Sequence, residues 1–209
     1  MRMHFPVRPF LLAALCLVTA PRAQKADGGL DAERRTATFF VSEDQVPPLA
    51  GVAISYTRAP WRAGYDAVLA PLQASNYTRL GNGWWTTLET IGPLELGGTK
   101  VEPGSYYLGL SVAADGAFTL LLFDSQRAMK ARLLPATTAL YTGEAKPDVR
   151  IPMAFTKDKA KDTTSLVIEM LADAKNPSRG TLVMRWGKHE LSAPVVFDLA
   201  AKKPGNAPK

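Results

Sequence analysis

The feature that most constrains this chain is a regular alternation of short apolar stretches and turn residues across residues 36–199. Val52, Ile54 and Tyr56, for example, alternate with small or polar residues, as in a strand with one buried face. Almost no stretch repeats its apolar residues at helical spacing. We therefore expect an all-β domain, an antiparallel β-sandwich with one short helix or irregular loop insertion. The alternative is a closed barrel with a ligand cavity.

Two dipeptides carry the clearest turn signals. Gly97-Gly98 separates two short alternating runs, and Asp115-Gly116 separates residues 105–112 from residues 117–123. Two-residue hairpin turns require positive φ, which glycine adopts at little cost, so both sites are predicted to be hairpins. The other strands are expected at 36–41, 51–58, 86–91, 94–96, 99–101, 149–155, 165–171, 180–186 and 189–199.

The helix is expected directly after strand 117–123. Asp124 is a favourable N-cap for a helix over residues 125–133, and Pro135 would stop it. Residues 65–73 have a composition compatible with a second short helix. Two further segments are expected to be irregular: a long loop at 136–147 and a turn at 176–178.

The first 23 residues have the pattern of a secretory signal. Arg2 and Arg8 precede the apolar run 10–18, which is followed by small residues. The run is about half the ~20 residues that a membrane-spanning helix needs. Cleavage after Ala23 would leave a flexible lead-in at 24–35, the domain at 36–199 and a disordered tail at 200–209. The protein is thus expected to be periplasmic or secreted, with no integral membrane span after cleavage.

Composition excludes several classes of function. Residues 1–23 contain three arginines and no acid, so their removal lowers the net charge from +6 to +3, which does not indicate a nucleic-acid-binding surface. The single cysteine, Cys16, leaves with this segment, and His189 is then the one remaining histidine. We therefore expect no metal site, no cofactor and no nucleic-acid partner.

The sequence offers no catalytic residue. A Ser-His-Asp hydrolase would have to use His189, which lies in the predicted hairpin 185–190 and alternates with charged neighbours, as an exposed strand residue would. No G-x-S-x-G motif is present. Paired carboxylates could still act on a glycan or other polymer, although nothing in the sequence selects a particular pair.

Residues 56–85 are rich in aromatic rings and arginines. Such a set suits a sugar or an anionic group, because a ring face packs on the apolar face of a sugar and a guanidinium binds a carboxylate bidentately. Trp84 and Trp85 are adjacent and should point to opposite faces. The candidate ligand-binding residues are Arg58, Trp61, Arg79, Asn82 and Trp84.

Within this set, Arg58 and Arg79 are expected to approach one another near Trp61 or Trp84 and to line the main pocket. The alternative is that each arginine ties down its own loop through backbone carbonyls or a nearby acid.

Three segments carry a further pattern. Ile54-Ser55-Tyr56-Thr57-Arg58-Ala59-Pro60 follows I-x-Y-x-R-P with one inserted residue, Tyr77-Thr78-Arg79-Leu80-Gly81-Asn82 follows W-R-x-G-x-N at a shifted spacing, and residues 96–108 follow I-x-G-K-x-L-P-A-G-x-Y-x-L. Residues 148–151 and 182–186 fit two later strands of the same pattern. Because these segments occur in this order, residues 41–199 resemble the bacterial family of domain of unknown function 2911. The resemblance implies an exported all-β domain of the bacterial envelope with no established activity.

Three hypotheses for function follow. The first is an exported noncatalytic β-sandwich that binds a small ligand or an envelope protein. The second is the carboxylate-dependent enzyme on a glycan or other polymer. The third is a structural or chaperone-like envelope module that pairs through a sheet edge.

Overall fold

The computed structural model describes residues 34–42, 50–62, 64, 77–134, 144–157 and 163–199. The expectations for the signal at 1–23, the lead-in up to residue 33, the helix at 65–73, most of the loop at 136–147 and the tail at 200–209 lie outside these residues. The described residues all belong to one unit, Asp31–Lys209. No helix within them has the length and apolarity needed to cross a membrane.

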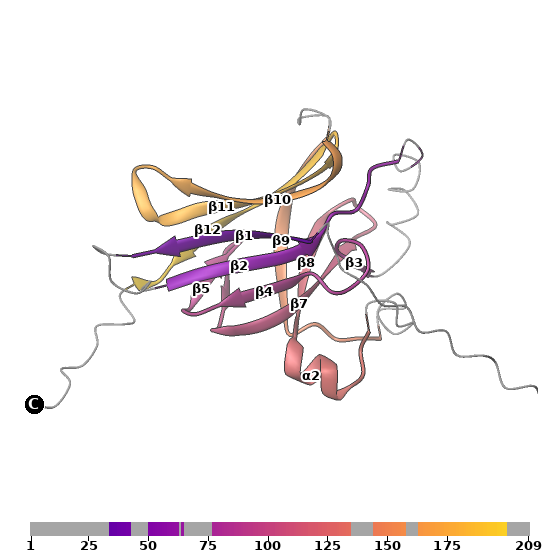
Figure 1. The fold of residues 1–209 in the computed structure, drawn as a ribbon, viewed down its shortest axis with the longest axis horizontal. Coiled ribbons are helices and arrows are strands. Elements are labelled where there is room, and N and C mark those ends of the chain that lie inside the picture. The colour runs from indigo at the N-terminus through magenta and orange to yellow at the C-terminus, as the bar shows by residue number, and fades with distance from the viewer. Residues whose placement is uncertain are drawn as a thin grey trace, which may run out of the picture. The chain divides into compact units, whose positions relative to one another are not determined.

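Strands dominate the described part of the chain (Figure 1). Every neighbouring pair of strands is antiparallel, which confirms the all-β expectation. The strands are β1 (Arg34–Val41), β2 (Ala50–Thr57), β3 (Thr78–Arg79), β4 (Thr87–Thr90), β5 (Leu94–Leu96), β6 (Thr99–Val101), β7 (Gly104–Val112), β8 (Phe118–Asp124), β9 (Val149–Thr156), β10 (Thr163–Asp173), β11 (Asn176–Gly187) and β12 (His189–Phe197). The helix is α2 (Ser125–Lys130).

These strands form one nearly closed sheet in the order β1-β2-β4-β7-β8-β9-β12-β11-β10. β9 joins its two halves, because residues 149–153 pair with β8 whereas residues 154–156 pair with β12. The two halves pack face to face as a sandwich that shares one strand.

The ends of the strand path, β1 and β10, lie beside one another without a backbone ladder among the described residues. Side chains link the strands on either side of this seam, from β2 to β10 and from β1 to β12. The Tyr56 hydroxyl accepts from the Ile168 N–H at 3.1 Å and contacts the Ile168 carbonyl at 3.4 Å. Phe39 packs on Phe197 with ring centroids 5.2 Å apart.

The interior core lies between the two halves of the sheet. Val52, Ile54 and Tyr56 are all buried, as their alternation predicts. β7 and β8 contribute Leu108 and Leu120, which are completely inaccessible. We call this cluster, built from the inward faces of all the long strands, the interior core.

Both predicted hairpins are confirmed. Gly97, Gly98 and Gly116 all have positive φ, at 57°, 77° and 85°. The turn predicted at 176–178 is wrong, because β11 already begins at Asn176. The chain instead reverses direction between Asp173 and Asn176, where the Asp173 carboxylate accepts the Lys175 N–H at 2.8 Å. β1 likewise begins at Arg34, so the lead-in predicted to reach residue 35 ends earlier.

Helix α2 begins as predicted and ends three residues early. The Asp124 side chain accepts the Arg127 N–H at 2.8 Å and caps the helix. At the other end, Arg132 N–H donates to Met129 and Leu133 N–H donates to Ala128, at 3.0 and 2.8 Å. This pair of bonds is a Schellman motif, which ends the helix before Pro135 is reached.

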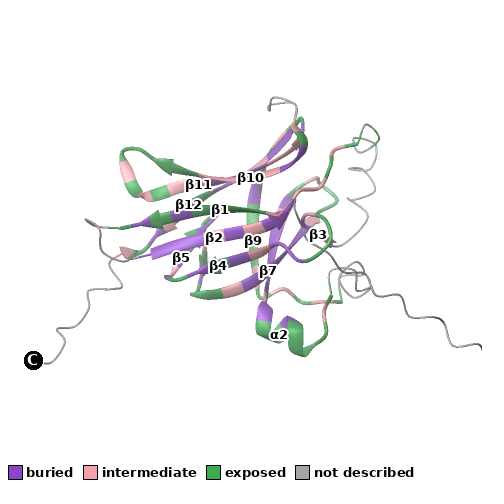
Figure 2. Ribbon diagram, in the orientation of Figure 1, coloured by how far each residue is buried: buried purple, intermediate pink, exposed green. Residues whose placement is uncertain are grey.

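A second apolar cluster lies on the outer face of β7 and β8, where α2 covers it (Figure 2). Trp85 is its centre and stacks on Tyr107 with the ring planes 4° apart and the centroids 5.1 Å apart. We call it the outer cluster; its buried residues are Tyr77, Trp85, Tyr107, Leu121, Phe123 and Ala128.

Candidate ligand-binding site

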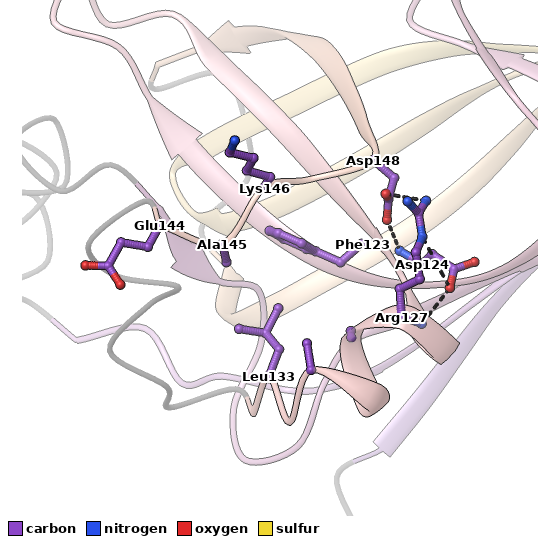
Figure 3. Close-up of a pocket in the computed structure, with 10 residues that line it drawn as sticks. Phe123, Asp124, Arg127, Leu133, Glu144, Ala145, Lys146 and Asp148 are labelled. Carbon is purple, nitrogen blue, oxygen red and sulfur yellow. Dashed lines mark hydrogen bonds and ion pairs between the residues drawn. The ribbon is translucent and has the colours of Figure 1, made fainter.

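A cavity of about 440 Å³ lies beside α2 (Figure 3). This volume falls in the range of about 300–1,000 Å³ that is usual for small-molecule sites. We call it the helix pocket; its lining residues are Phe123, Asp124, Arg127, Ala128, Ala131, Leu133, Glu144, Ala145, Lys146 and Asp148.

The apolar part of the helix pocket follows from how β8 runs into α2. Phe123 is the last outward-facing ring of β8 and is buried in the outer cluster. Ala128 and Ala131 are small, so α2 leaves space in front of this ring. Leu133 packs against the outer cluster, and its carbonyl accepts the Trp85 indole N–H at 3.3 Å. The outer cluster therefore holds the apolar wall in place.

The polar wall of the helix pocket is a connected group of three charged residues. The Arg127 guanidinium pairs with the Asp148 carboxylate and lies 3.9 Å from Asp124 Oδ1. Asp148 also accepts the backbone N–H of Asp124. These contacts join the helix N-terminus to the segment before β9, as the dashed lines in Figure 3 show. These contacts within the protein therefore hold the charged side chains of the polar wall in position without a ligand.

Tyr106 lies within electrostatic reach of this polar wall. Burial raises the pKa of its phenol, and the negative charges of Asp124, Glu102 and Asp148 raise it further, against a lowering by Arg127. Its hydroxyl donates to the Glu102 carbonyl at 2.9 Å.

Three carboxylates line the helix pocket, those of Asp124, Glu144 and Asp148. Asp124 and Asp148 each accept a backbone N–H and share Arg127, so both have structural partners. Among the described residues, no three histidine, aspartate, glutamate or cysteine side chains converge in a way that could hold a metal ion.

The two candidate arginines contact different partners. Arg58 Nε donates to the Ser165 hydroxyl of β10 at 2.8 Å. Arg79 Nη1 donates to the Gly83 carbonyl of its own loop at 3.2 Å. The Arg79 contact, to a backbone carbonyl of its own loop, is of the kind that the loop-anchoring alternative describes, whereas Arg58 binds a hydroxyl on a distant strand.

Of the other candidate residues, Asn82 lies near both arginines, in the loop that Arg79 contacts and beside the end of β2 that Arg58 follows. The Asn82 N–H donates to the Thr57 carbonyl at 3.4 Å, so loop 80–84 lies against the end of β2. Trp84 is 56% exposed whereas Trp85 is 1% exposed, and both residues precede β4 rather than lie in it. None of the five candidate residues lines the helix pocket.

Trp61 instead belongs to an aromatic group at one end of the interior core. Its ring meets Trp186 edge-on at 5.1 Å and His189 at 5.5 Å. Its backbone N–H donates to Thr164 of β10 at 2.8 Å. Gly187 lies against it so closely that a Cβ there would come within 2.4 Å of the ring.

The expectation that His189 is an exposed strand residue is wrong, because His189 is buried at 7% exposure. It opens β12 directly after a tight turn and faces inward, where Trp61 and Phe155 flank its ring. Its charged neighbours Lys188 and Glu190 suggested exposure, but the ring that covers His189 comes from a distant segment.

A second cavity of about 80 Å³ lies at this end of the interior core. Its walls are almost entirely hydrocarbon, and we call it the apolar cavity. Its lining residues are Leu80, Leu110, Phe118, Phe155, Leu166, Met184, Trp186, His189 and Leu191. None of the five candidate residues lines it, but Leu80 directly follows Arg79, and Trp61 packs on Trp186 and His189.

Sequence reasoning missed the helix pocket as a site. The Asp124 cap was a readable signal in the sequence. The pairing of Arg127 with Asp148 had no local signal, because these residues are brought together by the return of the chain into β9.

Comparison with known proteins finds no match for this chain among family models, curated proteins or solved structures.

Proposed function

We propose that the protein is an exported, noncatalytic β-sandwich of the bacterial cell envelope that binds a small molecule in the helix pocket. The observation that carries this proposal is the combination of a cavity of about 440 Å³ with a polar wall already held by Asp124, Arg127 and Asp148. Binding loses less conformational entropy when the polar side chains of the site are already held in position.

The lining residues support a ligand with an apolar body and a polar group. Phe123 and Leu133 offer an apolar wall to the body of the ligand. Glu144 and Lys146 stand at the other side, both exposed and opposite in charge. Arg127, which Asp148 holds in position, and the exposed Glu144 and Lys146 are the charged residues that would meet a polar group of the ligand.

A thermal-shift screen of small molecules tests the site, because a ligand that binds only the folded state raises Tm. Ala131→Trp fills the helix pocket from an exposed position at the end of α2 and should abolish the shift. Gln126→Trp is the matched control, since Gln126 is exposed on the same helix and does not line the pocket. A hit that stabilises the Ala131→Trp protein as much as the wild type would contradict the assignment.

Export is tested separately by fractionation of a tagged protein. We expect the chain to lose about 20–26 residues and to appear outside the cytoplasm. A full-length chain retained in the inner membrane would contradict cleavage of the signal.

The carboxylate-dependent enzyme remains a second candidate because three carboxylates line one pocket. Glycosidase mechanisms need two acids about 5–10 Å apart on either side of the bond. If the protein degrades a glycan, Glu144→Gln should remove the activity and leave Tm unchanged, since Glu144 is exposed. Activity that survives in both Glu144→Gln and Asp148→Asn would exclude these carboxylates.

A further inference from the structure

We infer that the apolar cavity is a second binding site, independent of the helix pocket, which takes the end of one straight alkyl chain of an anionic amphiphile. The inference rests on the walls of this cavity, on its size and on the charges of the segments beside it.

The walls select an apolar occupant. Five aliphatic side chains and the rings of Phe118, Phe155 and Trp186 form most of the surface. A cavity of this kind offers water almost no hydrogen-bond partner and stays dry, so an alkyl group entering it displaces no bound solvent. His189 contributes its ring, which lies 5.7 Å from that of Phe155.

The size selects a slender occupant. The volume of about 80 Å³ is roughly half that of a cavity known to hold benzene. Roughly two or three carbons of a straight chain fit, while a phenyl ring does not. The walls resist expansion because Phe118 and Phe155 pack at 4.6 Å, and Trp61 is wedged against Gly187.

The cavity lies close to the surface. Phe155 is 38% exposed and Trp186 is half-buried, although both line it. A chain end can therefore enter while the rest of the molecule stays outside.

Two of the segments beside the cavity favour an anionic head group, while the acid between the lining residues His189 and Leu191, Glu190, is paired with Arg185. In residues 58–64 and 77–84 every charged side chain is an arginine, namely Arg58, Arg62 and Arg79. Arg58 binds Ser165, the residue before the cavity-lining Leu166, and Arg79 precedes the cavity-lining Leu80. Guanidinium groups at this end of the molecule suit a carboxylate or phosphate.

Tryptophan fluorescence offers a direct test, because Trp186 lines the cavity and Trp61 packs on it. The probe is dodecanoate with a bromine on its terminal carbon, which quenches an indole that it touches. We expect saturable quenching, and clearly weaker quenching when the bromine sits beside the carboxylate instead. In the wild-type protein, equal quenching by the two brominated dodecanoates, or no quenching by either, is enough to overturn the inference.

Substitutions of Leu191 test whether the alkyl chain occupies the apolar cavity. Leu191→Phe should block the cavity and abolish quenching, while Leu171→Phe is the matched control on an exposed residue outside it. Leu191→Ala should enlarge the cavity and permit benzene to raise Tm, which benzene should not do in the wild type. Benzene binding to the wild-type protein would overturn the size argument.

The head group and its source are tested with unbrominated competitors. Dodecanol should displace the probe about tenfold less well than dodecanoate, the effect of losing one charge-assisted contact. Arg79→Gln should remove this difference, and Arg179→Gln, on the exposed side of β11, should not. Dodecanol equal to dodecanoate would overturn the anionic head group. Binding to phosphatidylglycerol vesicles without binding of monomeric dodecanoate would overturn a free amphiphile as the ligand.

Discussion

The interior core and the outer cluster are built from opposite faces of the same strands, yet they are held in different ways. Leu108, Leu120 and Leu122 of β7 and β8 face inward and are completely inaccessible. Tyr107 and Phe123 face outward from the same two strands and are covered by α2 and the segments beside it.

The interior core is stabilised by the large apolar area that it buries, whereas the outer cluster is stabilised by a few specific contacts. Many aliphatic side chains from both halves of the sheet fill the interior core. The outer cluster relies on the Trp85–Tyr107 stack, one indole hydrogen bond and the Asp124 cap. We therefore expect changes in the outer cluster and the helix pocket to disturb the sheet less than changes in the interior core.

The cavities beside the interior core and the outer cluster also differ, in size and in the polarity of their walls. The apolar cavity is a small gap at the end of the interior core with hydrocarbon walls, and the helix pocket is larger and partly charged. One site selects by shape and apolarity, and the other adds polar contacts.

The largest expected effects come from truncating the centre of each cluster. Trp85→Ala and Leu120→Ala should each lower the free energy of unfolding by several kcal/mol, in the range of about 2–5. Amide hydrogen exchange separates them, because Trp85→Ala should expose α2 far more than β11, whereas Leu120→Ala should reduce protection throughout the sheet. Uniform loss in both variants would contradict separate cores.

The next effect concerns the end of the interior core. Gly187→Ala places a Cβ 2.4 Å from the Trp61 ring at φ 62°, and should cost about 2–3 kcal/mol in urea unfolding. Gly98→Ala is the control: it has positive φ but no atom within 4 Å of its Cβ, and should cost only about 1–2 kcal/mol. If both cost the same, Trp61 is not wedged in place.

A stabilising change is expected beside the helix pocket. Arg132 has φ 54°, in the left-handed position of a Schellman motif where glycine is preferred. Arg132→Gly should therefore add about 1 kcal/mol to the free energy of unfolding and raise Tm. Lys130→Gly, inside the helix, should lower it by about 0.5–1 kcal/mol. A lower Tm for Arg132→Gly would show that the arginine side chain makes a compensating contact.

The smallest effect tests the coupling of stability to the protonation of Tyr106, whose pKa is raised first by burial and further by the charges of Asp124, Glu102 and Asp148. Because the pKa of Tyr106 is raised, the unfolded chain loses this proton first as the pH rises past its ordinary value of about 10. Stability should then fall as the pH rises, since the folded state binds more protons. Tyr106→Phe should flatten this fall between about pH 9 and pH 11 in urea midpoints. An unchanged slope would contradict the coupling.

Much of the fold was readable because its signals are local. The alternation at Val52, Ile54 and Tyr56 specifies a buried face, and Gly97-Gly98 specifies a hairpin, through interactions between neighbours in the chain. The Asp124 cap is local in the same way. The seam between β1 and β10 was not readable, since Tyr56 and Ile168 meet only after the sheet has curled.

The candidate site was readable in composition but not in arrangement. The sequence by itself determined strands, turns, a helix start and a segment at residues 56–85 that is rich in aromatic rings and arginines. Tertiary structure decided that Arg58 binds Ser165, that Trp61 covers His189, and that Asp148 meets Arg127. The physical reason is that the members of each pair are far apart in the chain or lie on different elements, so they meet only after the strands have paired and the segments between them have packed.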